Sequence, residues 1–178
     1  MASLGARMTG AMKADVATFE EIEHDPTAMG QAVTVIVIAG VAGLIGNIFR
    51  SGITGGVVAL IISLIGYAVW ALMVTVIGTK LMPEPTTKAE FPETFRTIAF
   101  AASPGIFNVL AIIPFLGWLI SFAISIWSLV IMVVAVRTVL DYSSTGRAII
   151  VVLIGWVIYW MVAAILGVMF LGAALVHG

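Results

Sequence analysis

The sequence predicts an all-α fold, a polytopic integral membrane bundle of five transmembrane helices preceded by a short amphipathic interfacial helix. Hydrophobic residues make up 62% of the chain and charged residues 10%, and the mean hydropathy is +1.20. Soluble domains have about half apolar and about a quarter charged residues. The apolar stretches are long and uncharged, as helices crossing about 30 Å of hydrocarbon require. The alternation typical of transmembrane strands is absent from the sequence.

Residues 1–27 are predicted to be a cytoplasmic acidic segment, and residues 28–178 the membrane domain. An amphipathic helix is expected over residues 10–25, lying on the membrane surface. Its apolar positions recur at helical spacing: Met12, Val16, Phe19 and Ile22. The density of carboxylates in this segment argues against a cleaved signal peptide.

The acidic face of this helix has two interpretations. Its carboxylates, Glu20, Glu21 and Glu23, can dock on basic residues of the same chain. The candidates for that docking surface are Arg96, Arg137 and Arg147. The alternative is a solvated face without a partner, which is the usual meaning of surface charge.

The first two spans are predicted at about 28–48 and 53–81, with Asp25 and Pro26 separating the first span from the acidic helix. Three glycines recur at a spacing of three in the first span: Gly40, Gly43 and Gly46. Small residues let a neighbouring helix approach closely. Packing within the chain is the favoured use of this face, and dimerisation is the alternative.

Three further spans are predicted at about 93–113, 118–139 and 146–175. Pro104 and Gly105 should kink the third span, because proline removes a backbone donor. In the fourth span, small weakly polar side chains for helix packing recur on one face: Ser121, Ser125 and Ser128. Arg137 and Asp141 are four residues apart, within reach of each other on a helix.

The distribution of Lys and Arg predicts the orientation. With five spans and a cytoplasmic N-terminus, the inner face holds seven of the eight Lys and Arg residues, and the C-terminus lies on the opposite side. A competing arrangement lays residues 91–103 flat on the surface and crosses once over residues 106–136. That arrangement moves Arg137 and Arg147 outside and is therefore disfavoured.

No pattern in the sequence predicts catalysis. There are no cysteines, and no nucleophile lies beside a base. Glu20, Glu21, Glu23 and His24 are more typical of a solvated face than of a metal site. His177 is expected to be an ordinary polar residue at the membrane interface, not a ligand of a pigment or haem. The net charge of −1 gives no basic field for nucleic acid, and no cofactor or metal is expected.

Three stretches carry a family resemblance: ATFEEIEHDP at 17–26, FPETFRTIAFAASPGIF at 91–107, and IWSLVIMVVAVRTVLDYSSTGRAI at 126–149. With five spans, this arrangement resembles the Yip family, the Ypt/Rab GTPase-interacting protein domain, in its short prokaryotic form. The resemblance implies a multi-spanning protein without catalytic residues. Eukaryotic members contact Rab GTPases through a long cytosolic N-terminal region. Here that region has only about 25 residues, so a Rab-type partner is not expected.

The sequence therefore predicts a non-enzymatic protein of the prokaryotic cytoplasmic membrane. Its expected role is that of a scaffold or accessory subunit of a membrane protein assembly, or of membrane organisation and trafficking as in Yip relatives. The expected partners are the lipid bilayer and other integral membrane proteins or a second copy of the chain. The alternative is a small transporter or channel that uses the kinked third span.

Overall fold

The computed structural model describes residues 2–113, 115–158 and 161, and within these every regular element is a helix. Six α-helices are joined by a π-helical turn, η1, and a 3-10 helix, η2. Their bounds are α1 Leu4–Met12, α2 Val16–His24, α3 Ala28–Gly46, α4 Ile48–Val76, η1 Ile77–Leu81, α5 Phe91–Phe100, η2 Ser103–Ile112 and α6 Gly117–Val139. A further apolar helix covers Thr145–Ile158.

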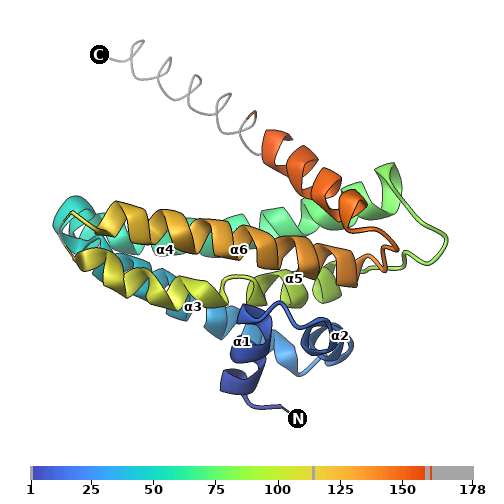
Figure 1. Cartoon of the computed structure of the whole chain (residues 1–178), viewed down its shortest axis with the longest axis horizontal. Coiled ribbons are helices and arrows are strands. Elements are labelled where there is room, and N and C mark those ends of the chain that lie inside the picture. The colour runs from blue at the N-terminus through green and yellow to red at the C-terminus, as the bar shows by residue number, and fades with distance from the viewer. Residues whose placement is uncertain (1, 114, 159–160, 162–178) are drawn as a thin grey trace.

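The long helices lie side by side along one axis, with α1 and α2 packed against one side of the bundle, below α5 in the view of Figure 1. Four segments are long and apolar enough to cross a membrane: Ala28–Gly46, Gly52–Leu81, Phe91–Ile112 and Gly117–Val139. The protein is therefore an all-helical integral membrane protein in a lipid bilayer. The later part of the predicted fifth span lies outside the described residues, and so does His177, so the number of five spans stays a prediction.

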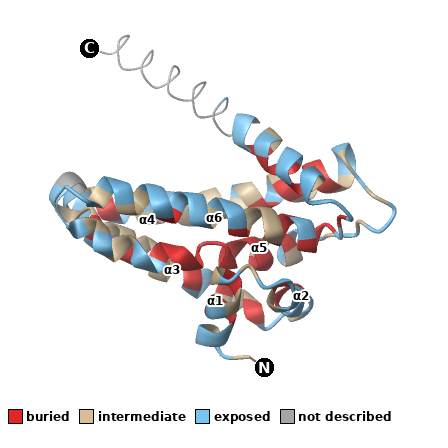
Figure 2. Cartoon of the chain, viewed as in Figure 1, coloured by how far each residue is buried: buried red, intermediate tan, exposed pale blue. Residues whose placement is uncertain are grey.

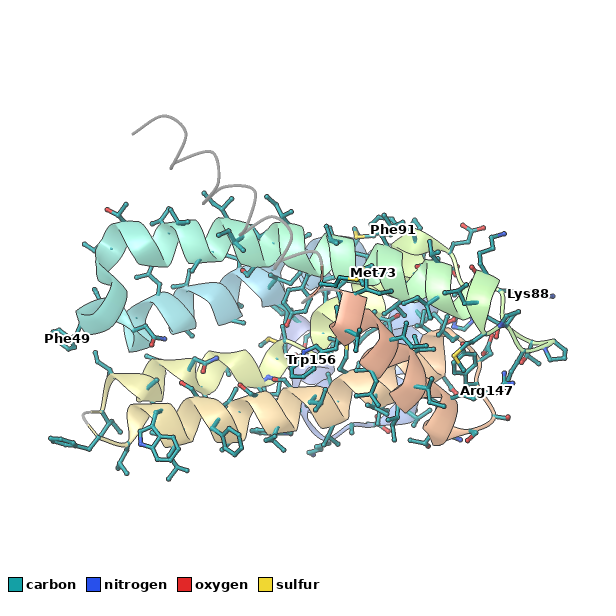
Figure 3. The ribbon with its side chains drawn as sticks, turned by 90° about the horizontal axis from the view of Figure 1, so that it is seen from above. Phe49, Met73, Lys88, Phe91, Arg147 and Trp156 are labelled. Carbon is teal, nitrogen blue, oxygen red and sulfur yellow. The ribbon has the colours of Figure 1, made fainter. Side chains whose placement is uncertain are left out.

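The two ends of the bundle differ in chemistry. The reversals between α3 and α4 and between η2 and α6 share one end, where Phe49 points outward (Figures 1 and 3). Phe49 is 85% exposed and Phe115 is 95% exposed at that end. The opposite end carries Lys88 and Arg147 (Figure 3). The end that carries Lys88 and Arg147 is called the polar end below, and α2 packs beside it, against the last turn of α6.

The N-terminal segment differs from the single helix expected over residues 10–25. The structure has two helices, because the backbone turns at Ala14, whose φ is 54°. Asp15 then caps α2, its side chain accepting a hydrogen bond of 3.2 Å from the backbone N–H of Thr18. Phe19 and Ile22 are fully buried in a core cluster with residues of α5 and α6. The apolar stripe of α2 thus packs against the protein.

The third span breaks where proline was expected to kink it. α5 ends at Phe100, and η2 continues from Ser103. The Ser103 hydroxyl donates to the Phe100 carbonyl at 2.7 Å, and the Gly105 N–H donates to the Ala102 carbonyl at 2.8 Å. These bonds use carbonyls that the interrupted helix leaves without their usual donors.

The chain then reverses before α6, where Phe115 has a φ of 66° and the Gly117 N–H donates to the Ile113 carbonyl at 3.0 Å. One continuous crossing over residues 106–136 is therefore excluded by the fold.

Small residues allow α3 and η2 to approach closely. A Cβ added at Gly46 would lie 1.9 Å from the Asn108 carbonyl oxygen, and one at Gly105 would lie 2.7 Å from the Ala39 Cβ. Gly40 faces α4, since an added Cβ would lie 2.3 Å from Leu60. Gly43 has no atom within 4 Å of that position. Two of the three predicted glycines thus lie at contacts within the chain, each with a different neighbour.

Candidate interaction surface

The buried guanidinium of Arg7 joins α1 to α2 and α3. Its side chain is 0% exposed and forms ion pairs with Glu21, at 2.9 Å, and with Asp25. A third bond, of 3.1 Å, goes to the Gln31 side chain on α3. The hydroxyl of Thr27 and then Arg7 lower the pKa of Asp25 to about 2. The carboxylate of Asp25 therefore stays ionised and helps to hold the N-terminal helices together.

Arg96 of α5 holds the C-terminal end of α2. It is 5% exposed; its Nε donates to the Ile22 carbonyl at 2.9 Å, and a terminal nitrogen donates to the Glu23 carbonyl. The last carbonyls of a helix lack intrahelical donors and carry the negative end of its dipole. A cation at this position both satisfies the carbonyls and stabilises the dipole. Arg96 therefore contacts the acidic helix through its backbone and not through its carboxylates.

Glu23 is the one buried carboxylate of the predicted surface. It is 8% exposed, and within the described part of the chain its carboxylate has no hydrogen bond or ion pair. Burial raises the pKa of Glu23 to about 7; His24 opposes this shift, and Asp141 adds to it. The side chain lines a cavity of about 470 Å³ between α2 and the end of α6.

Arg137 and Asp141 do not form the predicted pair. α6 ends at Val139, and Asp141 has a φ of 52°, so the two side chains are no longer one helical turn apart. Arg137 instead donates to the Tyr142 carbonyl at 3.3 Å and to the Thr145 hydroxyl at 3.2 Å. It therefore stabilises the turn that follows α6, while both charged residues border the cavity beside α2.

Arg147 contacts a different part of the polar end. Its Nε lies 3.3 Å from the Glu84 carboxylate, and the Ser143 backbone N–H donates to Glu84 at 3.0 Å. The backbone and side-chain hydrogen bonds from Ser143, followed by Arg147, lower the pKa of Glu84. The Thr87 hydroxyl also donates to the Leu140 carbonyl at 2.8 Å. These bonds join the segment 82–90 to the turn after α6.

A second cavity, of about 570 Å³, opens between α4, α6 and the helix Thr145–Ile158. It is mostly apolar and includes Tyr67, Trp70 and Trp156 in its lining. Two of the predicted packing serines, Ser125 and Ser128, line it, whereas the third, Ser121, accepts a hydrogen bond of 2.8 Å from Ser125 at its carbonyl. The serine face of α6 thus borders an open cavity.

The structure divides the predicted interaction residues into separate groups. Glu20, Glu23, Arg137 and Asp141 line one cavity. Glu21 pairs with Arg7, Arg96 binds carbonyls of α2, and Arg147 pairs with Glu84. In the described part of the chain, no three acidic or His side chains converge as metal ligands do.

The structural role of Arg7 was not predicted. A usable signal was present, because Arg7 falls on the same helical face as Leu4, Met8 and Ala11. A cation on an apolar stripe indicates a buried charge that needs partners. Glu84 had no comparable signal, since its partners are 59 or more residues away along the chain.

Comparison with known proteins supports the resemblance. A family model described as Yip1 domain matches residues 10–166. No curated protein and no solved structure shows a match. The matched range includes all three stretches that carry the resemblance and extends from α1 into the residues that follow the helix Thr145–Ile158.

Proposed function

The chain belongs to the Yip1 domain family, and we propose that this member is a non-enzymatic scaffold or accessory subunit of a membrane protein assembly. The exposed apolar faces of α4 and α6 carry the proposal. In the most apolar 18-residue stretch of Gly52–Leu81, only 11% of the residues are buried within the protein. In the corresponding stretch of Gly117–Val139, 22% are buried. Such faces are covered by lipid or by helices of other proteins.

The small side chains on these faces favour neighbouring helices. Ser125 is exposed on α6, at the open cavity between α4, α6 and the helix Thr145–Ile158, and its hydroxyl donates to the Ser121 carbonyl of its own helix at 2.8 Å. Small residues of this kind permit the close backbone approach on which helix association in lipid depends. The partners that we propose are therefore other integral membrane proteins or a second copy of the chain.

The covered polar end disfavours recruitment of a Rab-type GTPase. The apolar residues of α2, Phe19 and Ile22, are fully buried in the protein core. This N-terminal segment therefore offers no free apolar stripe to a soluble partner. In our proposal the polar end is cytoplasmic in a prokaryotic cell and the C-terminus lies on the opposite side, which follows the excess of Lys and Arg at that end.

Extraction of the untagged protein in a membrane-solubilising polymer, followed by native mass determination, tests the proposal. We expect a single species of defined stoichiometry that contains the chain and one other membrane protein or a second copy. Ser125→Leu should weaken that species. The control Ser144→Leu should not, because it lies outside the faces of α4 and α6 and costs only about 1 kcal/mol through the lost cap of 3.2 Å at the start of the helix Thr145–Ile158. A lone monomer under all extraction conditions would contradict the proposed role.

A small transporter or channel is the second candidate. The ten-residue 3-10 helix η2 supports it, because runs of this conformation longer than three or four residues are uncommon and broken helices occur in transporters. Solute flux in proteoliposomes distinguishes the two candidates. The accessory role predicts no flux above that of empty vesicles, and reproducible flux abolished by Gly105→Leu would favour transport.

A further inference from the structure

The cavity between α2 and the end of α6 has the chemistry of a binding site. Its volume of about 470 Å³ lies within the range of about 300 to 1,000 Å³ that is typical of small-molecule sites. Glu20 and Glu23 line it from α2, and Asp141 lines it from the turn after α6. Apolar atoms of Val16 complete the α2 side. His24 and Arg137 line it as well, so the cavity has three carboxyl groups beside one guanidinium and one imidazole, and it is partly apolar.

Glu23 is the feature that points to a ligand. It lines the cavity while only 8% exposed, and it has neither a hydrogen bond nor an ion pair within the described part of the chain. An unpaired buried carboxylate is costly. The side chain is nevertheless held in place, because Arg96 binds the backbone carbonyls of Ile22 and Glu23.

The cations near Glu23 are committed to other oxygens. Arg96 donates to the two α2 carbonyls, and Arg137 donates to the Tyr142 carbonyl and the Thr145 hydroxyl. The titratable and charged groups around Glu23 are Glu20 and His24 of α2, Glu93 and Arg96 of α5, and Arg137, Asp141 and Tyr142 at the end of α6. The ring of His24 attracts the Glu23 carboxylate but bonds the Glu20 carbonyl at 2.8 Å instead. Acidic groups face Glu23 from all three sides, and its carboxylate, which none of these cations binds directly, remains available to an additional cation.

We propose that this cavity binds an alkylammonium or alkylguanidinium group, with Glu23 as the counter-ion and Glu20 and Asp141 at the rim. A metal ion fits less well, because no three acidic or His side chains in the described part converge as ligands. An alkyl stem suits the apolar atoms of Val16. The cation comes either from a free amine or from a basic side chain of another protein, and the site does not depend on the proposed function.

Protection from a carbodiimide tests the site directly on the full-length protein. Dicyclohexylcarbodiimide adds a protonated carboxyl across its C=N bond, and the adduct rearranges to a stable N-acylurea with no leaving group. A carboxyl with a pKa of about 7 is partly protonated at neutral pH, so peptide mass analysis should show labelling of Glu23. We expect n-butylguanidinium at about twice its Kd to slow this labelling about threefold. The neutral isostere n-butylurea should give no protection, and equal protection by both compounds would overturn the proposal.

Thermal unfolding provides a second readout, because Glu23→Gln removes the labelled group. n-Butylguanidinium should raise the apparent Tm of the wild-type protein, and Glu23→Gln should weaken its binding about tenfold or more. Glu21→Gln is the matched control, since Glu21 pairs with Arg7 and does not line the cavity. The control should retain the response to the probe. An unchanged response in Glu23→Gln would contradict the assignment of the counter-ion.

The same probe distinguishes the two sources of the cation. A basic side chain of another protein predicts that n-butylguanidinium releases a co-extracted chain from the native assembly. A free amine predicts that the assembly survives at saturating probe. Failure of the probe to bind the isolated chain overturns the site and leaves the proposed scaffold role untouched, because the exposed faces of α4 and α6 are separate from this cavity.

Discussion

The polar end and the membrane body of this protein are held together in different ways. The polar end consists of α1, α2, the segments 82–90 and 140–147, and α5, which is also the first half of the third span. Buried residues concentrate around its helices (Figure 2). Apolar residues such as Phe19, Ile22 and Phe100 pack together there, and hydrogen bonds and ion pairs in addition join segments far apart in sequence. The membrane body consists of α3, α4, η2 and α6, whose outer faces are largely exposed (Figure 2). Close approach at small residues holds these helices together.

The polar end is fixed by contacts between its segments, whereas the membrane body keeps its outer surface free for other helices. In the polar end, a single side chain such as Arg96 satisfies two carbonyls of another helix, so its loss affects an entire element. In the body, hydroxyls such as those of Thr75 and Ser125 bond carbonyls of their own helices, at 2.9 and 2.8 Å. Such bonds leave the lipid-facing surface free for other helices. The predictions below test this contrast.

Replacement of Arg96 should have the largest effect. Arg96→Met leaves the carbonyls of Ile22 and Glu23 without these donors and should lower the free energy of unfolding by about 4 kcal/mol. Protease cleavage within residues 1–25 should also accelerate. Arg137→Met is the matched control, because Arg137 is exposed, and it should cost less than about 1 kcal/mol. Equal effects of the two changes would show that the polar end does not depend on Arg96.

Glu23 should make the polar end sensitive to pH. Its pKa is about 7 in the folded protein against an ordinary value of 4.5. The folded state therefore retains a proton that the unfolded chain has lost, so the free energy of unfolding should fall as the pH rises from about 4.5 to about 7. The expected change is on the order of 3 kcal/mol. The raised pKa of His24, caused first by its bond to the Glu20 carbonyl, acts in the same direction.

Thermal unfolding across this pH range measures the effect, and Glu23→Gln should remove most of the slope. Asp25 provides an internal contrast, because its pKa is lowered to about 2 from 3.8. Its contribution is lost only as the pH falls through that lower range. If Glu23→Gln leaves the dependence of the free energy of unfolding on pH unchanged, another group causes that dependence.

The close approach of α3 and η2 should depend on Gly46. In Gly46→Ala the new Cβ would lie 1.9 Å from the Asn108 carbonyl oxygen, so the backbones must separate at a cost of about 2 kcal/mol. Gly43→Ala is the control, since no atom lies within 4 Å of its added Cβ. That change should be neutral or up to about 1 kcal/mol stabilising. Unfolding in detergent compares the two variants, and identical stabilities would contradict the described contact.

The smallest effect is expected at Glu84. Its partner Arg147 has a side chain that is 42% exposed, and such pairs contribute less than about 1 kcal/mol. Glu84→Gln should therefore increase hydrogen exchange locally, in residues 82–90 and 141–147, while the global unfolding temperature changes little. Increased exchange throughout α4 would mean that this segment stabilises more of the protein than its contacts indicate.

The membrane body was the easier part to predict from sequence. Long apolar runs set the positions of the four described spans, and Pro104 marked the region of the break in the third, since the absence of its N–H acts locally. The extent of η2, Ser103–Ile112, was not predictable, because no local signal in the sequence distinguishes a ten-residue 3-10 helix from an α-helix after the proline. The break between α1 and α2 was also missed, because a continuous apolar stripe does not reveal the positive φ of Ala14.

The sequence indicated which charged residues belong to the polar end but not which contacts they make. Charge alone drew attention to Glu20, Glu21 and Glu23, yet only tertiary structure separates the buried Glu23 from its exposed neighbours. The charge of Arg96 predicts docking of carboxylates, whereas the structure shows it bound to carbonyls. Every helix end has free backbone carbonyls, so the sequence does not indicate which side chain of another element will donate to them.

Photo-crosslinking in the native membrane tests most directly whether the body is the surface that partners use. A benzophenone side chain would replace Ile61 on α4 or Val130 on α6, which are 52% and 55% exposed, and Val74, which is fully buried, would serve as the control. We expect the two exposed positions to capture one defined membrane protein or a second copy of the chain, at matching stoichiometry, and the buried position to capture neither. Lipid adducts alone at both exposed positions would contradict it.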